Sequence, residues 1–315
     1  MEYVAILFLA VVMDLVIGEP PRAFHLTVWA GKLVDFFGRF GLTLGRPVWQ
    51  FIYGTLMTLF IIALFSIASY FLLDYLSGLS TVLYILIAAF LLKTTFCWRD
   101  SSRLSIKVRD YLTSKAKGPH EASKEIRYLL STVEYSKEEN KEASIASSTI
   151  RSLFENSADF LVGPLFYFLI LGVPGALAYR AANILYGMIG HHGQYEYLGK
   201  FAARLDDILS YIPARLTALL TVLAAAINKS NAIKTWRVTL ADYGKTESIN
   251  AGWTMAAAAG ALGVQLERAG YYTLGIAERP LTAATITEAV RLFNILAIAL
   301  IIICMASLSA ITLIC

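Results

Sequence analysis

Acidic side chains stand directly beside apolar segments at several places in this sequence. Glu155 and Asp159 precede the apolar run that starts at Phe160, and Asn156 lies between them. On a helix, residues four positions apart share one face. Mg²⁺ in proteins uses one or two carboxylates together with substrate phosphates. The spacing therefore fits a metal site at Glu155 and Asp159, and it equally fits polar flanking of a membrane helix.

Asp14 lies inside an otherwise apolar segment and is followed by Gly18-Glu19-Pro20 and by His25. An ionisable side chain within an apolar segment is costly to bury, so it is a functional candidate by default. The alternative is a carboxylate at a helix end in the membrane interface, because Gly18 follows closely.

Basic residues form a further group, which consists of Arg180 with Asn183, Arg204 with Asp206 and Asp207, and Arg215. Arg215 falls within an apolar run and needs either a partner or an anionic ligand. Asp206 and Asp207 are the expected internal partners. A structural salt bridge and an anion site are therefore both open, and the same ambiguity applies to Arg180 and Asn183.

The segment Asn250-Ala251-Gly252-Trp253 leads into a run of alanine and glycine. Glycine lets a ligand approach the backbone closely, but small residues also allow helices to pack tightly. The sequence contains no Walker A motif, nucleophile elbow or zinc signature. Residue chemistry alone therefore predicts carboxylates and arginines gathered at apolar borders.

The elements that position these residues are apolar helices. The chain of 315 residues is 57% hydrophobic and only 16% charged, with a mean hydropathy of +0.61, whereas soluble domains have about 25% charged residues. Blocks long enough for a membrane helix, or close to it, run over 51–73, 81–98 and 294–315, and proline interrupts those at 160–179 and 208–227. We expect an all-α, polytopic membrane helical bundle with interrupted or re-entrant helices in its second half.

Basic loops predict the orientation and the domains. Residues 18–50, 99–159 and 228–293 are rich in Lys and Arg, which places them in the cytoplasm by the positive-inside rule. We expect three N-terminal membrane helices in 1–98 and a cytoplasmic helical region in 99–159, with helices at 103–113 and 121–133. An interrupted membrane core that carries the site motifs follows in 160–293. The chain then has a transmembrane helix in 294–315. The side of 180–207 stays open.

In this order, the motifs resemble the CobD/CbiB family, the adenosylcobinamide-phosphate synthases of cobalamin biosynthesis. The resemblance covers most of the chain and is strongest at 155–167, 174–183, 188–190, 203–207, 211–216, 250–253 and 259–266, with an opening motif from Asp14 through His25 to Leu33. It implies a multi-pass protein of the cell membrane with its active site on the cytoplasmic side.

The resemblance also implies an activity. The family joins a carboxylate of adenosylcobyric acid, a corrinoid, to an aminopropanol phosphate or a related amino alcohol, and ATP and Mg²⁺ are the expected cofactors. The implied partners are the lipid bilayer and other membrane enzymes of the cobalamin pathway. We expect no nucleic-acid partner.

Roles follow for residues that match the family's motifs. Catalytic or amine-handling candidates are Glu155, Asp159, Asp206 and Asp207, with Glu155 and Asp159 also the metal candidates. Candidates for binding substrate or phosphate are Asp14, His25, Asn156, Arg180, Asn183, Arg204, Arg215, Asn250 and Trp253.

The sequence also departs from the family pattern, because Arg151, Tyr186 and Met255 stand where the family usually has carboxylates. These departures motivate an alternative hypothesis, a paralogue that keeps the fold as a corrinoid-binding or partner-binding membrane scaffold. A transporter or channel is a third hypothesis, which the absence of an internal sequence repeat disfavours.

Overall fold

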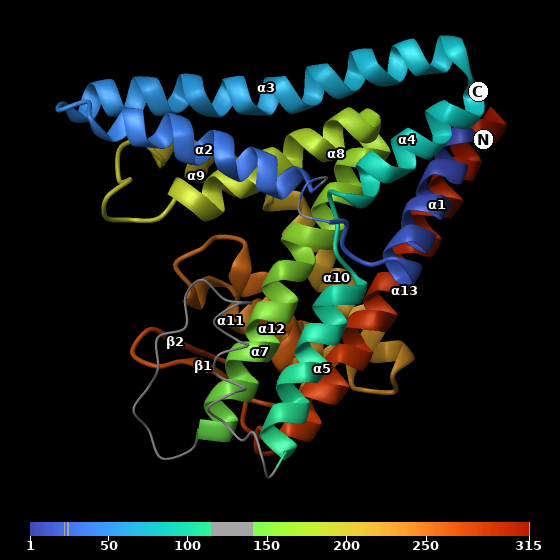
Figure 1. Cartoon of the computed structure of the whole chain (residues 1–315). Helices are drawn as coiled ribbons and strands as arrows, with labels where there is room; N and C mark the ends of the chain where they lie inside the picture. Colours follow the sequence, from blue (N-terminus) through green and yellow to red (C-terminus); the bar gives the residue numbers. More distant parts are fainter. Residues whose placement is uncertain (22, 24, 115–140, 315) are drawn as a thin grey trace. The chain divides into compact units, whose positions relative to one another are not determined.

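A computed structural model describes residues 1–21, 23, 25–114 and 141–314 of the chain. The described chain is 80% helical with almost no sheet, which confirms the predicted all-α class (Figure 1). The predicted helix at 103–113 is present within a longer helix, Arg99–Thr113. The one predicted at 121–133 lies outside the described residues.

Helices group into two compact units, each assembled from separated parts of the sequence. Unit 1 comprises Met1–Cys97, Asp159–Ser210 and Ile303–Cys315, and unit 2 comprises Trp98–Ala158 and Tyr211–Ile302. Each unit therefore combines segments from both halves of the chain, so residues that carry chemistry are brought together within a unit from distant positions.

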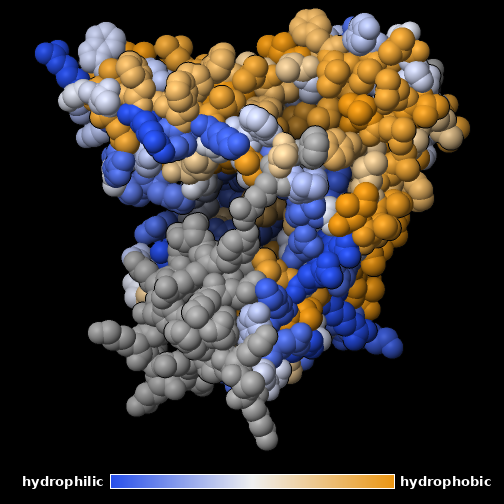
Figure 2. Space-filling view, viewed as in Figure 1, coloured by the Kyte–Doolittle hydropathy of each residue, from blue (hydrophilic) through white to orange (hydrophobic). Residues whose placement is uncertain are grey.

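Unit 1 is built on one long helix. Its elements are α1 (Glu2–Val16), α2 (Leu26–Leu42), α3 (Pro47–Leu79), α4 (Thr81–Lys93), the π-helix η2 (Ala158–Val162), α8 (Gly163–Ile189) and α9 (Lys200–Leu209). Helix α3 packs against α2, α4, α8 and α9, and α1 packs against α4. Much of the surface over α3 is apolar (Figure 2), with Phe60 and Phe71 more than half exposed.

Three helices among the described residues are long and apolar enough to cross a membrane, namely Pro47–Leu79, Glu142–Ile189 and Ala283–Leu313. A fourth is possible if Lys200–Leu209 and Tyr211–Ile227 form one broken span. Helix α4 has 13 residues, fewer than the about 20 that a full span needs. The predicted span at 81–98 is thus shorter than expected, because the helix ends at Lys93, whose side chain forms buried ion pairs.

Interrupted helices occur in the second half of the chain, as predicted. The backbone of Gly172 leaves the helical conformation at φ 66° and ψ −161°, values that a residue without Cβ adopts at little cost. Pro174 follows two residues later and cannot donate a helical hydrogen bond. The π-helix η2 directly precedes Gly163 and Pro164. The third predicted break point, Pro213, lies in the first turn of Tyr211–Ile227, just after a 44° bend between that helix and Lys200–Leu209.

Unit 2 surrounds a short helix of small residues. Its elements are α5 (Arg99–Thr113), α7 (Lys141–Ser157), α10 (Tyr211–Ile227), α11 (Ala232–Asp242), the 3₁₀ turn η3 (Tyr243–Lys245), α12 (Ala251–Leu262), the antiparallel pair β1 (Leu266–Arg268) and β2 (Tyr272–Leu274), and the first part of α13 (Ala283–Ile314). Helix α12 contacts α7, α10 and α11. The side chains of Ala256 to Ala259 are fully buried, so the alanine run is a packed interior helix.

A glycine in α3 permits a close contact with the segment that precedes α9. A Cβ atom added at Gly54 would lie 1.9 Å from the carbonyl oxygen of Leu198, so Gly54→Ala forces the backbone apart. We expect this variant to lower the melting temperature of the detergent-solubilised protein, with a cost of about 1–3 kcal/mol from overpacking.

The matched control for Gly54→Ala is Gly78→Ala in the same helix. A Cβ atom at Gly78 meets nothing within 4 Å, and alanine is the better helix former by about 1 kcal/mol. Equal melting temperatures for the two variants would contradict the close contact between α3 and Leu198.

Candidate functional site

A buried ionic cluster joins the N-terminal segments of unit 1. Nζ of Lys93 lies 3.1 Å from Oδ1 of Asp14 and 3.1 Å from Oε1 of Glu19, and it donates to the carbonyl oxygen of Phe96 at 3.3 Å. The side chains of Lys93 and Asp14 are only 3% and 1% exposed. Asp14 is therefore inside the protein with a cationic partner and is not an exposed interfacial carboxylate.

Sequence reasoning missed Lys93. A signal existed, because Lys93 is the single charge at the end of the apolar run 81–92, and a charge in that position needs a partner. The pairing with Asp14 links segments that are far apart in the sequence, which spacing alone does not reveal.

His25 extends this cluster to the start of α2. Its Nδ1 accepts a hydrogen bond from the backbone N–H of Thr27 at 3.2 Å, so the ring caps the helix. Nε2 therefore carries the proton and donates to Oε2 of Glu19 at 2.5 Å. Burial alone would raise the pKa of the Glu19 carboxyl, but the hydrogen bond from His25 and the charge of Lys93 lower this pKa to about 2.

The guanidinium of Arg180 forms a second group in unit 1. Nη1 donates to Oδ1 of Asn183 at 2.9 Å, and Asn183 in turn donates from Nδ2 to Oδ1 of Asp206 at 3.3 Å. Both Asn183 and Asp206 are buried. The ring of Phe160 lies 4.2 Å from the guanidinium carbon. Nε of Arg180 is shielded from solvent and has no hydrogen-bond partner among the described residues.

Two carboxylates lie close enough to Arg180 to act on its charge. Asp159 and Glu19 both interact with the guanidinium electrostatically, so the Arg180 group and the Lys93 cluster belong to one charged region of unit 1. This region brings together Asp14, His25, Asp159, Arg180, Asn183 and Asp206 from the predicted set.

Aromatic residues fix helix α8 against the end of α9. The rings of Tyr167 and Tyr179 stack at 5.1 Å. The hydroxyl of Tyr179 lies 3.0 Å from Oγ of Ser210, and that of Tyr167 donates to the carbonyl oxygen of Leu209 at 3.0 Å. These contacts hold Asp206 beside Asn183. Arg204 and Asp207, by contrast, form an outward pair at 3.4 Å in which the arginine is 74% exposed.

Arg215 is the centre of a separate group in unit 2. Nη1 donates to Oδ1 of Asn250 at 2.8 Å and to the carbonyl oxygen of Tyr211 at 2.8 Å, and Nη2 donates to that of Ile249 at 3.3 Å. We expected Asp206 or Asp207 as its partner, and the structure gives it neutral oxygens instead. The reason is that Asn250 begins α12, which packs against α10 in the same unit.

Aromatic rings enclose this arginine. The guanidinium carbon of Arg215 lies 3.4 Å from the ring centre of Tyr211 and 5.0 Å from that of Trp253. Trp253 also stacks on Tyr243 at 4.3 Å. Nε1 of Trp253 is shielded from solvent and has no hydrogen-bond partner within the part of the chain that the structure describes.

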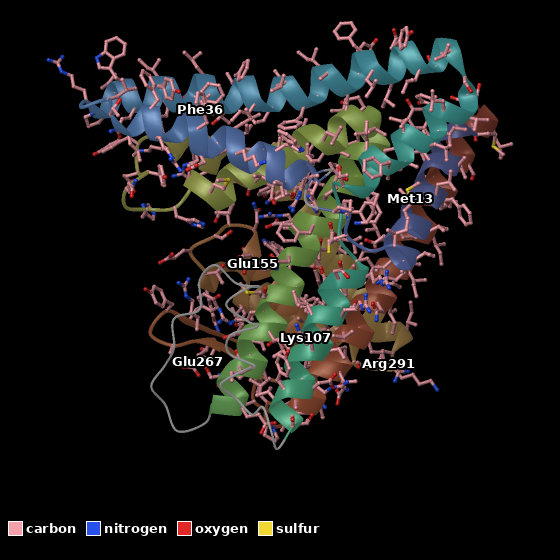
Figure 3. All side chains as sticks on the ribbon, viewed as in Figure 1. Met13, Phe36, Lys107, Glu155, Glu267 and Arg291 are labelled. Carbon is pink, nitrogen blue, oxygen red and sulfur yellow. The ribbon has the colours of Figure 1, made fainter. Side chains whose placement is uncertain are left out.

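Glu155 lies on α7 in unit 2 (Figure 3). It interacts electrostatically with Arg151 and Arg268. Nη1 of Arg151 donates to the hydroxyl of Tyr272 at 3.1 Å, and that hydroxyl donates to the sulfur of Met255 at 3.7 Å. Two of the positions where the sequence departs from the family pattern are thus in contact with the same tyrosine.

Asn156 takes a local role, since its Nδ2 donates to Oγ of Ser152 at 3.0 Å. Glu155 and Asn156 belong to unit 2 and Asp159 belongs to unit 1, so the metal pair stays a prediction. Among the described residues, no group of three or more His, Cys, Asp or Glu side chains could hold a metal ion. Any Mg²⁺ here would need oxygen ligands from a substrate, as is usual for this ion.

The fold and these groups define a class of protein: a helical membrane-type chain with arginines held beside neutral amides, aromatic rings and carboxylates. The chain belongs to the CobD/CbiB protein family, whose model matches residues 7–293. This confirms the resemblance found in the sequence.

Curated relatives cover nearly the whole chain. A protein of Dehalococcoides mccartyi (strain CBDB1) named cobalamin biosynthesis protein CobD is 41% identical over 93% of this chain and 94% of its own length. Probable cobalamin biosynthesis proteins CobD from Methanothermobacter thermautotrophicus and Methanocaldococcus jannaschii are each 36% identical, over 94% and 86% of this chain and 94% and 87% of their own lengths. No solved structure matches the chain.

Replacing Lys93 tests the ionic cluster. Lys93→Met leaves the Asp14 carboxylate buried without its cation, and removal of one partner from a buried pair costs about 3–5 kcal/mol. We expect a large drop in melting temperature in detergent. Lys200→Met, at an exposed position of unit 1, serves as the control and should change little. If both variants melt alike, the buried pair does not stabilise unit 1.

The lowered pKa of Glu19 predicts a defined acid response. The pKa is about 2 in the folded protein against 4.5 for the unperturbed group, so the ionised carboxylate stabilises the fold above about pH 4.5, and this stabilisation is lost as the pH falls toward 2. The difference in melting temperature between the native protein and Glu19→Gln should therefore shrink over this interval. A difference independent of pH would exclude the pairing of ionised Glu19.

Proposed function

We propose that this chain acts in cobalamin biosynthesis by forming an amide between a carboxylate of adenosylcobyric acid and the amine of aminopropanol phosphate, or of a related amino alcohol, with ATP as the energy source. The family membership and the names of its relatives support the pathway. The observation that carries the reaction type is the Arg180 group, an arginine in a charged region whose shielded Nε donor has no partner in the described parts of the chain.

The proposed chemistry follows from the poor reactivity of carboxylates. The corrin carboxylate attacks the terminal phosphorus of ATP, so that ADP leaves and an acyl phosphate forms. The amine of the second substrate then attacks the acyl carbon, phosphate leaves with the bonding electrons, and the amine loses one proton. Both steps develop negative charge on phosphate oxygens, which fixed cations stabilise.

Arg180 suits the stabilising role. Its partly buried guanidinium donates to the neutral amide of Asn183 and keeps its positive charge for an anion. Arginine matches phosphate and carboxylate geometry with paired hydrogen bonds. Asn183 orients it, because Asp206 anchors the other end of the amide. Asp206 and Asp159 are the proposed groups for handling the proton of the attacking amine.

Arg215, Asn250 and Trp253 form the second proposed binding group. Tyr211 and Trp253 flank the cation, an arrangement that holds the guanidinium rigid and leaves the Nε1 donor of Trp253 for a ligand. Flat ligands with polar edges, such as a corrin side chain or a nucleotide base, match such a surface. We also propose supporting positions near the bound substrates for Asp14, His25, Arg204 and Asp207.

Magnesium would bind through Glu155 or Asp159 together with phosphate oxygens, and when bound it would neutralise charge on the nucleotide. Arg151 and Arg268 near Glu155 already compensate this carboxylate. That observation favours the alternative function, a scaffold that binds a corrinoid without turnover, and the assay below separates the two.

The test is a turnover assay with purified full-length protein in detergent, supplied with adenosylcobyric acid, aminopropanol phosphate, ATP and Mg²⁺. Mass spectrometry should detect a product with one new amide bond, and its formation should require ATP. Folded protein that binds the corrinoid but forms no product would establish the scaffold alternative.

Arg180→Gln should lower kcat/KM about 100- to 1,000-fold, the usual loss when one charge-stabilising donor is removed, and Arg180→Lys should recover part of it. The control is Arg46→Gln, at an exposed position of the same unit, which should retain full activity. An Arg180→Gln protein with native melting temperature and native kcat/KM would remove Arg180 from the site.

A further inference from the structure

We propose that the groove between α5 and α13 in unit 2 binds one anionic phospholipid, with the headgroup phosphate at Arg103, Lys107 and Arg291 and an acyl chain along the isoleucines of α13. The groove has a volume of about 620 Å³ and is lined by one face of each helix. None of the residues proposed for amide formation lines it.

Hydrogen bonds between the helices hold the groove open in a fixed shape. Oδ1 of Asn294 accepts from Nε1 of Trp98 at 2.8 Å and from Oγ of Ser102 at 2.9 Å. Farther along, Nη1 of Arg109 donates to Oγ1 of Thr287 at 3.2 Å. These contacts join α5 to α13 at two separate levels, so the space along them is preformed.

Positive charge dominates the lining. Arg103 and Lys107 are four residues apart on α5 and share a face, and Arg291 projects from α13 (Figure 3). All three side chains are exposed. Among the described residues that line the groove, Asp110 is the one carboxylate, and it is paired with Arg109 at 2.7 Å. Basic side chains therefore outnumber acidic ones in this part of the lining.

Apolar residues continue from the cations in the direction of the predicted membrane span. Arg291, Ile295 and Ile298 follow at helical spacing on the lining face of α13. Ile298 is 49% exposed, and Ile302 beyond it is 63% exposed. Helix α13 is itself long and apolar enough to cross a membrane, so this surface faces hydrocarbon.

Cationic residues followed by apolar residues match a phospholipid, in which an anionic headgroup is followed by apolar acyl chains. A free phosphate would account for the cations but not for the apolar lining beside them, whereas a lipid uses both. Basic pockets next to membrane helices recognise anionic headgroups, and the positive-inside rule predicts that α5 lies on the side where such lipids carry the surface charge.

The experiment measures retained lipid. Full-length protein is reconstituted in nanodiscs of phosphatidylcholine with phosphatidylglycerol in equal parts, released, and examined by native mass spectrometry. One phosphatidylglycerol should stay bound. Arg103→Gln combined with Arg291→Gln should weaken its binding about 30-fold, since one basic residue near an anionic surface contributes about 1 kcal/mol.

The matched control removes the same charge elsewhere in unit 2, with Lys229→Gln combined with Arg237→Gln, both at exposed positions. It should retain the lipid as the native protein does. Equal loss in both double variants, or full retention in the groove variant, would overturn the proposal. So would binding of glycerol phosphate, which has no acyl chain, as tightly as phosphatidylglycerol.

Discussion

Unit 1 depends on the ion pairs that Lys93 makes with two carboxylates. The chain around it is apolar, and a lone ammonium or carboxylate there would be strongly unfavourable. By contacting both Asp14 and Glu19, Lys93 fixes the end of α4 against α1 and against the segment that leads into α2. The same contacts explain why α4 stops short of a full span, since its last residue must reach the carboxylates rather than the opposite surface.

The two arginines Arg180 and Arg215 donate to neutral acceptors. Arg180 and Arg215 donate to the side-chain amides of Asn183 and Asn250, and Asn183 is itself held by Asp206. A neutral acceptor orients a guanidinium without cancelling its charge, so both groups keep the capacity to bind an anion. Lys93 is therefore a structural cation, whereas Arg180 and Arg215 are the cations proposed to bind ligands.

The helical class and the proline-linked breaks were predicted from the sequence, because each depends on local composition. The buried alanine helix α12 also follows from its small residues. Partners were harder to predict. Arg215 was expected beside Asp206 or Asp207 because these are close in sequence, but the fold supplies Asn250 from a distant segment. Lys93 was overlooked for the same reason, and the contact of Arg151 and Met255 with Tyr272 depends on a β-hairpin too short to predict.

The central claim is that the corrin carboxylate becomes an acyl phosphate before it becomes an amide. Following its oxygen atoms is the most direct test. Adenosylcobyric acid labelled with ¹⁸O in the reacting carboxylate is incubated with the protein, aminopropanol phosphate, ATP and Mg²⁺, and the released inorganic phosphate is analysed by mass spectrometry. The proposed chemistry transfers one ¹⁸O to each phosphate. Product formed with unlabelled phosphate, or no product from folded protein, would contradict it.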